Sequence, residues 1–177
     1  MGVGTIPDAS FDRVGSVLLR ALDGLTLQQL KAQPAGTDSN PIGWIAFHLT
    51  RVHDRTFSLL LGKVQAFVEG GFHELFGLPA DTGTLSGNTL DEVREFNPNS
   101  AELLSSYWTA ARGHSHKFLE GLTETDIETP TPPGVGPASP PETYRLTVAR
   151  VTSDTSQHIG QIAYARGLVD RHGWYGA

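Results

Sequence analysis

The sequence predicts an all-α protein: a four-helix bundle with long crossover connections, forming one domain over residues 1–177. Three observations support this. Four long segments repeat apolar residues at steps of three and four, the spacing of a helix that buries one face. No segment of useful length alternates apolar and polar residues as a half-buried strand would. Stretches rich in Gly, Pro and Asn separate the segments, so long connections should join the helices.

The first long helix is expected from Ser10 to about Leu25. Asp8 or Ser10 could cap its start, because short polar side chains accept hydrogen bonds from the unpaired N–H groups of a first turn. A short helical turn follows over residues 26–32, and a Pro-Ala-Gly sequence then breaks the pattern. The apolar residues of the first helix are Phe11, Val14, Val17, Leu18, Ala21, Leu22 and Leu25.

Asn40 and Pro41 predict the start of the second long helix. Asn40 would be the cap, and Pro41 would occupy the first helical position, where its missing N–H costs nothing. The helical pattern continues over residues 42–61, and Gly62 should end it.

Residues 63–88 are expected to form a structured loop with short helical turns. Thr89 and Glu92 match a capping box, which predicts a short helix to about Phe96. The third long helix is expected over residues 100–122.

Residues 129–141 contain six prolines, too many for the interior of a helix or sheet. We expect an extended connection over the surface, because too little chain follows for a second domain. The fourth long helix should run over residues 142–168.

Composition excludes several classes of function. The chain has no cysteine, which excludes disulfides, thiolate catalysis by the chain itself and cysteine-ligated zinc. Its net charge is −6 and its basic residues are scattered, so we expect no nucleic-acid partner. The N-terminal residues do not resemble a signal peptide, and every apolar stretch is too short to span a membrane. A cytoplasmic protein with no membrane partner is therefore expected.

Three polar side chains stand where apolar ones are expected. His48 lies four residues from both Trp44 and Val52, on a line that borders the apolar face of the second long helix. Asp154 and His158 are four residues apart on the fourth, on a line that also contains Val151 and Ile162. Burying the carboxylate alone would be costly, whereas a divalent cation shared by all three side chains would remove that cost.

Plainer interpretations remain open. His48 could be a core histidine bonded to a carbonyl group, and Asp154 and His158 could form a surface ion pair. Gln161, one turn from His158, could reach a ligand or a metal-bound water, or bond to another helix. Trp44 is expected to serve packing. The remaining histidines are weaker ligand candidates: His53 and His73 could lie at the rim, His114 and His116 should be solvated, and His172 lies in the tail.

Two motifs carry a family resemblance. Residues 40–49 (NPIGWIAFHL) and 156–161 (SQHIGQ) resemble the DinB superfamily, and residues 76–79 fit the same pattern. The actinobacterial branch with Gly-Trp-x3-His-Leu and His-x-Gly-Gln segments, which includes mycothiol-dependent maleylpyruvate isomerase, is the most similar. The resemblance implies a DinB/YfiT-like bundle, usually a homodimer, with a three-ligand metal site. His48 and His158 match two ligands, whereas Asp154 stands where the family usually has His.

This resemblance implies zinc, nickel or iron as the metal, and a low-molecular-weight thiol of the mycothiol type as a cosubstrate for transfer to a small-molecule substrate. The first hypothesis is therefore a metal-dependent thiol S-transferase or isomerase. The second is a non-catalytic metal- or ligand-binding bundle, and the third is a helical interaction module without metal. Metal analysis and displacement of metal-bound water by a thiol distinguish the three.

Overall fold

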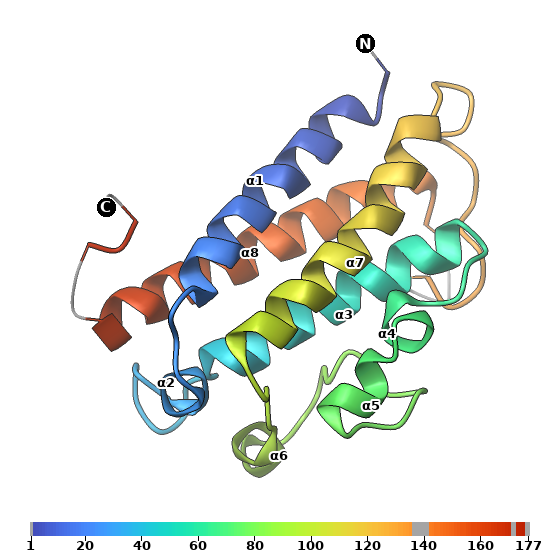
Figure 1. Cartoon of the computed structure of the whole chain (residues 1–177). Coiled ribbons are helices and arrows are strands. Elements are labelled where there is room, and N and C mark those ends of the chain that lie inside the picture. Colours follow the sequence, from blue (N-terminus) through green and yellow to red (C-terminus); the bar gives the residue numbers. More distant parts are fainter. Residues whose placement is uncertain (1, 136–141, 171–172, 176–177) are drawn as a thin grey trace.

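The computed structural model describes residues 2–135, 142–170 and 173–175. Four long helices form the bundle: α1 (Thr5–Leu22), α3 (Ile42–Leu60), α7 (Ala101–Gly121) and α8 (Tyr144–Asp170). α7 and α8 each pack against both α1 and α3, so α1 and α3 occupy opposite corners (Figure 1). No strand occurs in the described residues, and the predicted all-α bundle is confirmed.

Long connections join the four helices, as predicted. The first contains α2 (Leu27–Lys31), and the second contains α4 (Ala66–Glu69), α5 (Phe72–Phe76) and α6 (Leu90–Glu95). α4, α5 and α6 gather on one side of the bundle (green in Figure 1). The third connection is paired with the start of α8 by an isolated bridge between Pro130 and Thr143. Its predicted extended path lies partly outside the described residues, at 136–141.

The start of α1 differs from the sequence prediction. The helix begins at Thr5, with Gly4 as a cap that makes no side-chain hydrogen bond, so neither Asp8 nor Ser10 caps it. Ser10 instead lies inside the helix and donates to the carbonyl of Ile6 at 2.9 Å. Pro7 is tolerated because the N–H groups of a first turn have no partner within the helix.

Other helix ends agree more closely with the sequence. Thr89 and Glu92 form the predicted capping box at α6, and Ser100 caps α7. Pro41 precedes α3 as its cap rather than occupying its first turn, so Ile42 is the first helical residue.

Two apolar clusters fill the bundle. One surrounds Phe47, whose ring lies within 6.1 Å, centroid to centroid, of the rings of Phe67, Phe76, Phe96 and Tyr107. The other, further along the bundle, includes Phe11, Phe57 and Phe118. Burying a large apolar side chain stabilises a fold by about 1.5–3 kcal/mol, so the clusters supply most of the driving force for folding. Among the described residues, no helix is both long and apolar enough to cross a bilayer.

Candidate metal centre

The structure brings His48, Asp154 and His158 together, as the sequence predicts. One ligand atom from each residue lies within 4.8 Å of the other two. His48 comes from α3, whereas Asp154 and His158 lie one turn apart on α8. The rings of His48 and His158 meet edge to face, with centroids 4.8 Å apart. Because α3 and α8 pack directly against each other, the bundle itself sets the distance between the ligand atoms.

Hydrogen bonds orient both imidazole rings. His48 Nδ1 lies 2.6 Å from the carbonyl oxygen of Thr84, so this nitrogen carries the proton and donates it. His158 Nδ1 lies 2.9 Å from Gln161 Oε1 and donates in the same way. In each neutral ring the lone pair is then on Nε2. A partner on the second nitrogen is the usual arrangement behind a metal-binding histidine.

The third side chain has an unused oxygen. Asp154 Oδ1 lies 3.6 Å from His158 Nε2, whereas Oδ2 is buried and has no hydrogen-bond partner among the described residues. The Asp154 side chain is 33% exposed, and that of His158 is 19% exposed. The pair is therefore half-buried rather than a surface ion pair. A buried carboxylate oxygen without a partner is costly, and a bound cation would remove that cost.

Electrostatics keep the carboxylate ionised. Burial raises the pKa of Asp154, but the hydrogen bond from His158 and the charges of His158, His48 and Arg150 outweigh it and lower the pKa overall. Burial lowers the pKa of His48, in spite of the opposing hydrogen bond to Thr84. The hydrogen bond to Asp154 raises the pKa of His158. In the metal-free cluster, Asp154 and His158 therefore each favour the charged form of the other, whereas burial favours the neutral form of His48.

These residues fit a divalent cation. Two imidazoles and a carboxylate form a donor set used by catalytic zinc and by non-haem iron. Zinc with bonds of about 2.0–2.1 Å in tetrahedral geometry would hold its ligand atoms about 3.4 Å apart. The Asp154 to His158 separation of 3.6 Å is already close to that value. For atoms at the wider limit of 4.8 Å, a closer approach by about 1.4 Å would be needed.

Trp44 and a neighbouring hollow complete the surroundings. The Trp44 ring stacks on the His48 ring, with centroids 5.1 Å apart and planes within 2° of parallel. Gln161 lies beside His158 and also lines a hollow of about 200 Å³, shared with Asn40, Ile45 and Tyr164. Gln161 is thus the residue that the hollow and the candidate metal centre share as a neighbour.

Sequence reasoning misplaced His53. Its side chain was expected at a wetter rim, yet it is fully buried between Phe11, Phe57 and Trp108. α3 has neighbours on several sides, so a residue about 140° around the helix from His48 still faces the interior.

His73, His114 and His116 also lie apart from the cluster. His73 lies against Phe67, and its Nδ1 is 3.3 Å from the carbonyl oxygen of that residue. His114 was expected to be solvated, but its side chain is only 18% exposed and it bonds to Ser58. His116 is exposed as predicted. His172 lies outside the described residues.

Comparison with known proteins places the chain in a family. The family model described as the DinB superfamily matches residues 10–162, which include all three residues of the cluster. The chain belongs to the DinB superfamily. A similar solved structure is described as the conserved protein of a locus from Enterococcus faecalis. It is 22% identical, covers 97% of this chain and 99% of its own, and has a TM-score of 0.84. That likeness shows a shared fold. No curated protein sequence matches the chain.

Proposed function

We propose that this DinB-superfamily protein is a metal-dependent enzyme that transfers a low-molecular-weight thiol to a small electrophilic substrate. One observation carries the proposal: two imidazoles held by hydrogen bonds on Nδ1 face a carboxylate whose second oxygen is buried and has no hydrogen-bond partner in the described part of the chain. His48, Asp154 and His158 would bind the cation. Three protein ligands leave at least one coordination position open, which distinguishes a catalytic site from a closed structural one.

The donor set restricts the metal. Zinc, nickel and iron(II) all accept imidazole and carboxylate ligands. The Asp154 carboxylate, in place of a third imidazole, adds a negative charge to the site. This charge favours binding of a divalent cation rather than of a neutral molecule. We therefore expect one divalent ion for each chain, with zinc as the first candidate.

The nucleophilic sulfur must come from a cosubstrate, because the chain has no cysteine. A divalent cation at this position would lower the pKa of a bound thiol and favour the thiolate at neutral pH. In the transfer, the thiol proton leaves to solvent and sulfur forms a bond to the electrophilic carbon. The electron pair of the broken bond departs with the leaving group. Mycothiol-type thiols are the proposed cosubstrates on the strength of the family resemblance.

The chain's own residues would orient the reactants. Gln161 bonds to the His158 ring and also lines the hollow, so an electrophile bound there would contact the residue that orients one cation ligand. The stacked ring of Trp44 limits rotation of His48. At about 200 Å³ the hollow is smaller than a typical pocket for a drug-sized ligand, which favours a small substrate.

Metal stoichiometry tests the proposed ligands. Protein purified without a histidine tag and washed with a chelator is reloaded with zinc, and the metal content of each chain is measured by mass spectrometry. We expect about one ion for the wild type. We expect the same for the control His116→Ala, because this exposed histidine lies outside the proposed site. We expect loss of the ion in His158→Ala and Asp154→Ala. Unchanged stoichiometry in both ligand variants would overturn the assignment.

Thiol binding separates catalysis from plain metal binding. Cobalt-loaded protein is titrated with a low-molecular-weight thiol, and a new sulfur-to-cobalt absorption band is expected as the thiol takes the open position. Turnover is then assayed with that thiol and a panel of small electrophiles. A loaded protein whose spectrum does not respond to thiol would instead be a non-catalytic metal-binding bundle.

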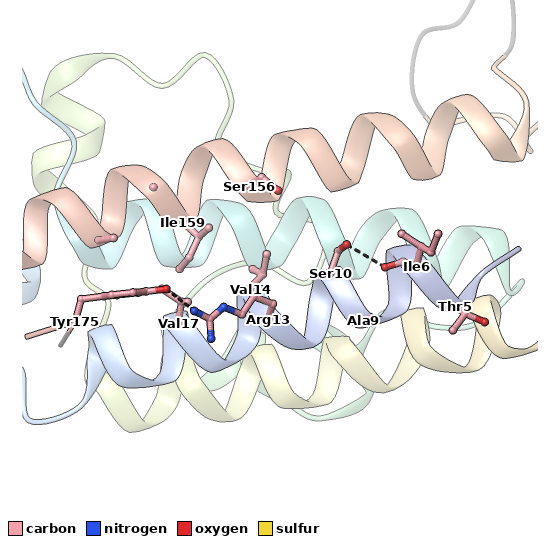
Figure 2. Close-up of a pocket in the computed structure, with 12 residues that line it drawn as sticks. Thr5, Ile6, Ala9, Ser10, Arg13, Val14, Val17, Ser156, Ile159 and Tyr175 are labelled. Atoms are coloured by element: carbon pink, nitrogen blue, oxygen red, sulfur yellow. Dashed lines mark hydrogen bonds between the residues drawn. The ribbon is translucent and has the colours of Figure 1, made fainter. Parts of the chain in front are cut away.

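We also propose that the protein is a homodimer. An apolar groove of about 800 Å³ runs between α1 and α8 and is lined by Val14, Val17 and Ile159 (Figure 2). Ile6 borders this groove and is 74% exposed. In light scattering, Ile6→Glu should shift a wild-type dimer to monomer, whereas Val64→Glu, at an exposed valine after α3, should not. A monomeric wild type would contradict the proposal.

A further inference from the structure

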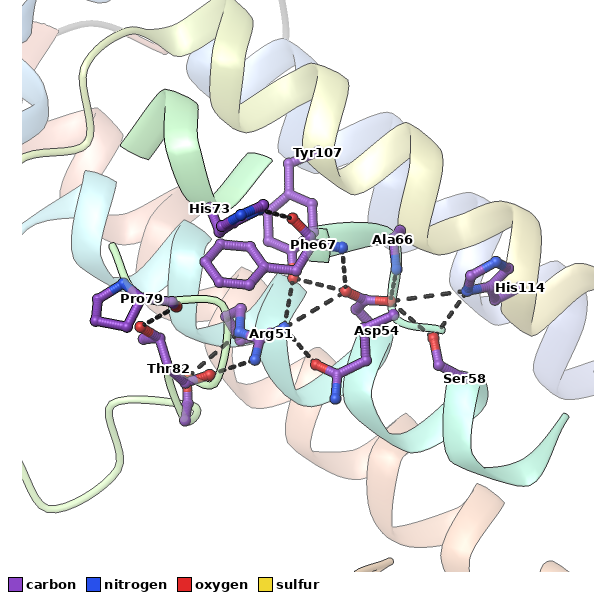
Figure 3. A network of polar contacts seen from close by, with 12 residues as sticks. Arg51, Asp54, Ser58, Ala66, Phe67, His73, Pro79, Thr82, Tyr107 and His114 are labelled. Atoms are coloured by element: carbon purple, nitrogen blue, oxygen red, sulfur yellow. Dashed lines mark hydrogen bonds and ion pairs between the residues drawn. The ribbon is translucent and has the colours of Figure 1, made fainter. Parts of the chain in front are cut away.

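Arg51 is a buried cation next to the candidate metal centre, and the proposed function does not use it. It is 1% exposed and lies on α3, three residues after His48. Side chains three apart on a helix leave from the same face, so Arg51 and His48 reach toward the same neighbouring segment. Figure 3 shows its guanidinium at the centre of a network of polar contacts.

One side of the guanidinium is held by the interior of the protein. Arg51 Nη1 donates to Gln65 Oε1 at 2.8 Å and to the Tyr107 hydroxyl at 3.1 Å. It lies 3.5 Å from Asp54 Oδ2, which balances its charge. The Phe67 ring covers the guanidinium, with its centroid 4.1 Å from the central carbon. These contacts fix the position and plane of the group.

The other side of the guanidinium holds a loop. Arg51 Nη2 donates to the carbonyl oxygen of Thr82, and Nε donates to that of Gly83 at 3.3 Å. The next carbonyl oxygen, that of Thr84, accepts the hydrogen bond from His48 Nδ1. Two residues on one helix therefore bind three successive carbonyl groups. Among the described residues, these contacts are the hydrogen bonds that join residues 82–84 to the helices.

The loop itself has no regular structure that would place the Thr84 carbonyl. Leu85 follows directly with a φ of 64°, a left-handed conformation that is unfavourable for a leucine. Local hydrogen bonds within the loop, such as Thr82 Oγ1 to the carbonyl of Pro79, shape the turn but do not anchor it to α3. Removing the anchor would free the loop to move away from His48.

We propose that Arg51 is a positioning residue for the metal centre, acting through the loop on the tautomer of His48. By holding the Thr82 and Gly83 carbonyls, Arg51 presents the Thr84 carbonyl to His48 Nδ1–H, and the lone pair of Nε2 then faces Asp154 and His158. The inference rests on the proposed metal site. Arginine is required because its planar fork can donate to both carbonyls and to the interior at once, which a lysine ammonium cannot do.

A matched pair of variants tests the role. Arg51→Lys keeps the charge beside Asp54 but loses the fork that holds the loop. Tyr107→Phe removes a hydroxyl that bonds to both Arg51 and Asp54, so it disturbs the same buried network while leaving the loop contacts in place. Both should lower stability, whereas only Arg51→Lys should alter His48.

The first readout is nitrogen NMR of metal-free protein labelled in its histidines, with His48 assigned by substitution. The wild type and Tyr107→Phe should show His48 protonated on Nδ1. In Arg51→Lys the Nε2 resonance should move toward its protonated position. The second readout is zinc affinity by chelator competition, which should fall at least about tenfold in Arg51→Lys, the usual effect of losing support behind a metal ligand.

A second variant covers the case in which Arg51→Lys does not fold. Arg51→Met fills a similar volume without a donor to the loop, while Asp54 keeps its hydrogen bonds from Ser58, Tyr107 and the backbone N–H groups of Ala66 and Phe67. It should produce the same shift at His48. An unchanged His48 tautomer in both loop-releasing variants, or an equal shift in Tyr107→Phe, would overturn the proposal. Wild-type protein that binds no metal would refute the proposed function while leaving the tautomer measurement valid.

Discussion

His53 should make the stability of this protein depend strongly on pH. The side chain is fully buried, and neither ring nitrogen has a hydrogen-bond partner among the described residues. Burial, together with the nearby charge of Arg112, lowers the pKa of His53 to about 3. Rings of Phe11, Phe57 and Trp108 surround it, with centroids 4.7–4.8 Å away. His53 is therefore neutral in the folded protein at every physiological pH.

The sign and size of the effect follow from linkage. In the unfolded chain His53 titrates at 6.5, whereas in the folded protein its pKa is about 3. Between these values the unfolded state binds the extra proton, so the folded state loses stability as the pH falls below 6.5. One pKa unit corresponds to about 1.4 kcal/mol, so His53 alone should remove about 2 kcal/mol of stability between pH 7.5 and pH 5.

The assay compares the wild type with His53→Phe by urea unfolding at pH 7.5 and pH 5. Phenylalanine keeps an aromatic ring of similar size and cannot titrate, and no hydrogen bond is lost. The variant should be at least as stable as the wild type at pH 7.5, because a buried polar group without a partner is removed. Its loss of stability on acidification should be smaller by about 2 kcal/mol. Parallel pH profiles for the two proteins would refute the reasoning.

Three further substitutions test the packing of the bundle. A Cβ added at Gly15 would lie 2.6 Å from Trp108 Nε1, so Gly15→Ala should destabilise the fold by about 1–3 kcal/mol. Gly113→Ala, with no neighbour within 4 Å on the exposed side of α7, should instead stabilise it by about 0.5–1 kcal/mol. Phe47→Ala should cost about 3–5 kcal/mol, because the ring is fully buried among four aromatic neighbours. Denaturant unfolding measures the free energy of unfolding of all three variants. Equal changes in Gly15→Ala and Gly113→Ala would contradict the close contact between Gly15 and Trp108.

Helix periodicity predicted the four long helices because each one buries an apolar face against its neighbours. Helix ends were harder to predict. α1 begins at Thr5 and includes Pro7, because a proline in the first turn of a helix loses no hydrogen bond. Asp8 and Ser10 therefore do not mark the start of the helix. It ends at Leu22, shortly before Gly24 adopts a φ of 68°, although the apolar pattern continues to Leu25. Leu25 lies in the connection after α1, and its side chain still packs into the core.

The three cluster residues could be predicted because each breaks an apolar pattern. The Thr84 carbonyl could not, because a backbone oxygen carries no sequence signal and the loop that presents it has no periodicity. Arg51 was missed for a related reason. A lone arginine on a helix is usually solvated, and its burial depends on Asp54, Gln65 and Tyr107, which converge on it only in the folded bundle. The interior position of His53 likewise depends on how many helices surround α3.

Anomalous diffraction from crystals of zinc-loaded protein, recorded on both sides of the zinc absorption edge, tests the central claim most directly. The account predicts one peak for each chain within about 2.0–2.2 Å of His48 Nε2, His158 Nε2 and an Asp154 oxygen, with the Thr84 contact to His48 retained. A peak elsewhere, for instance between His114 and Glu69, or no peak in fully loaded protein, would contradict it.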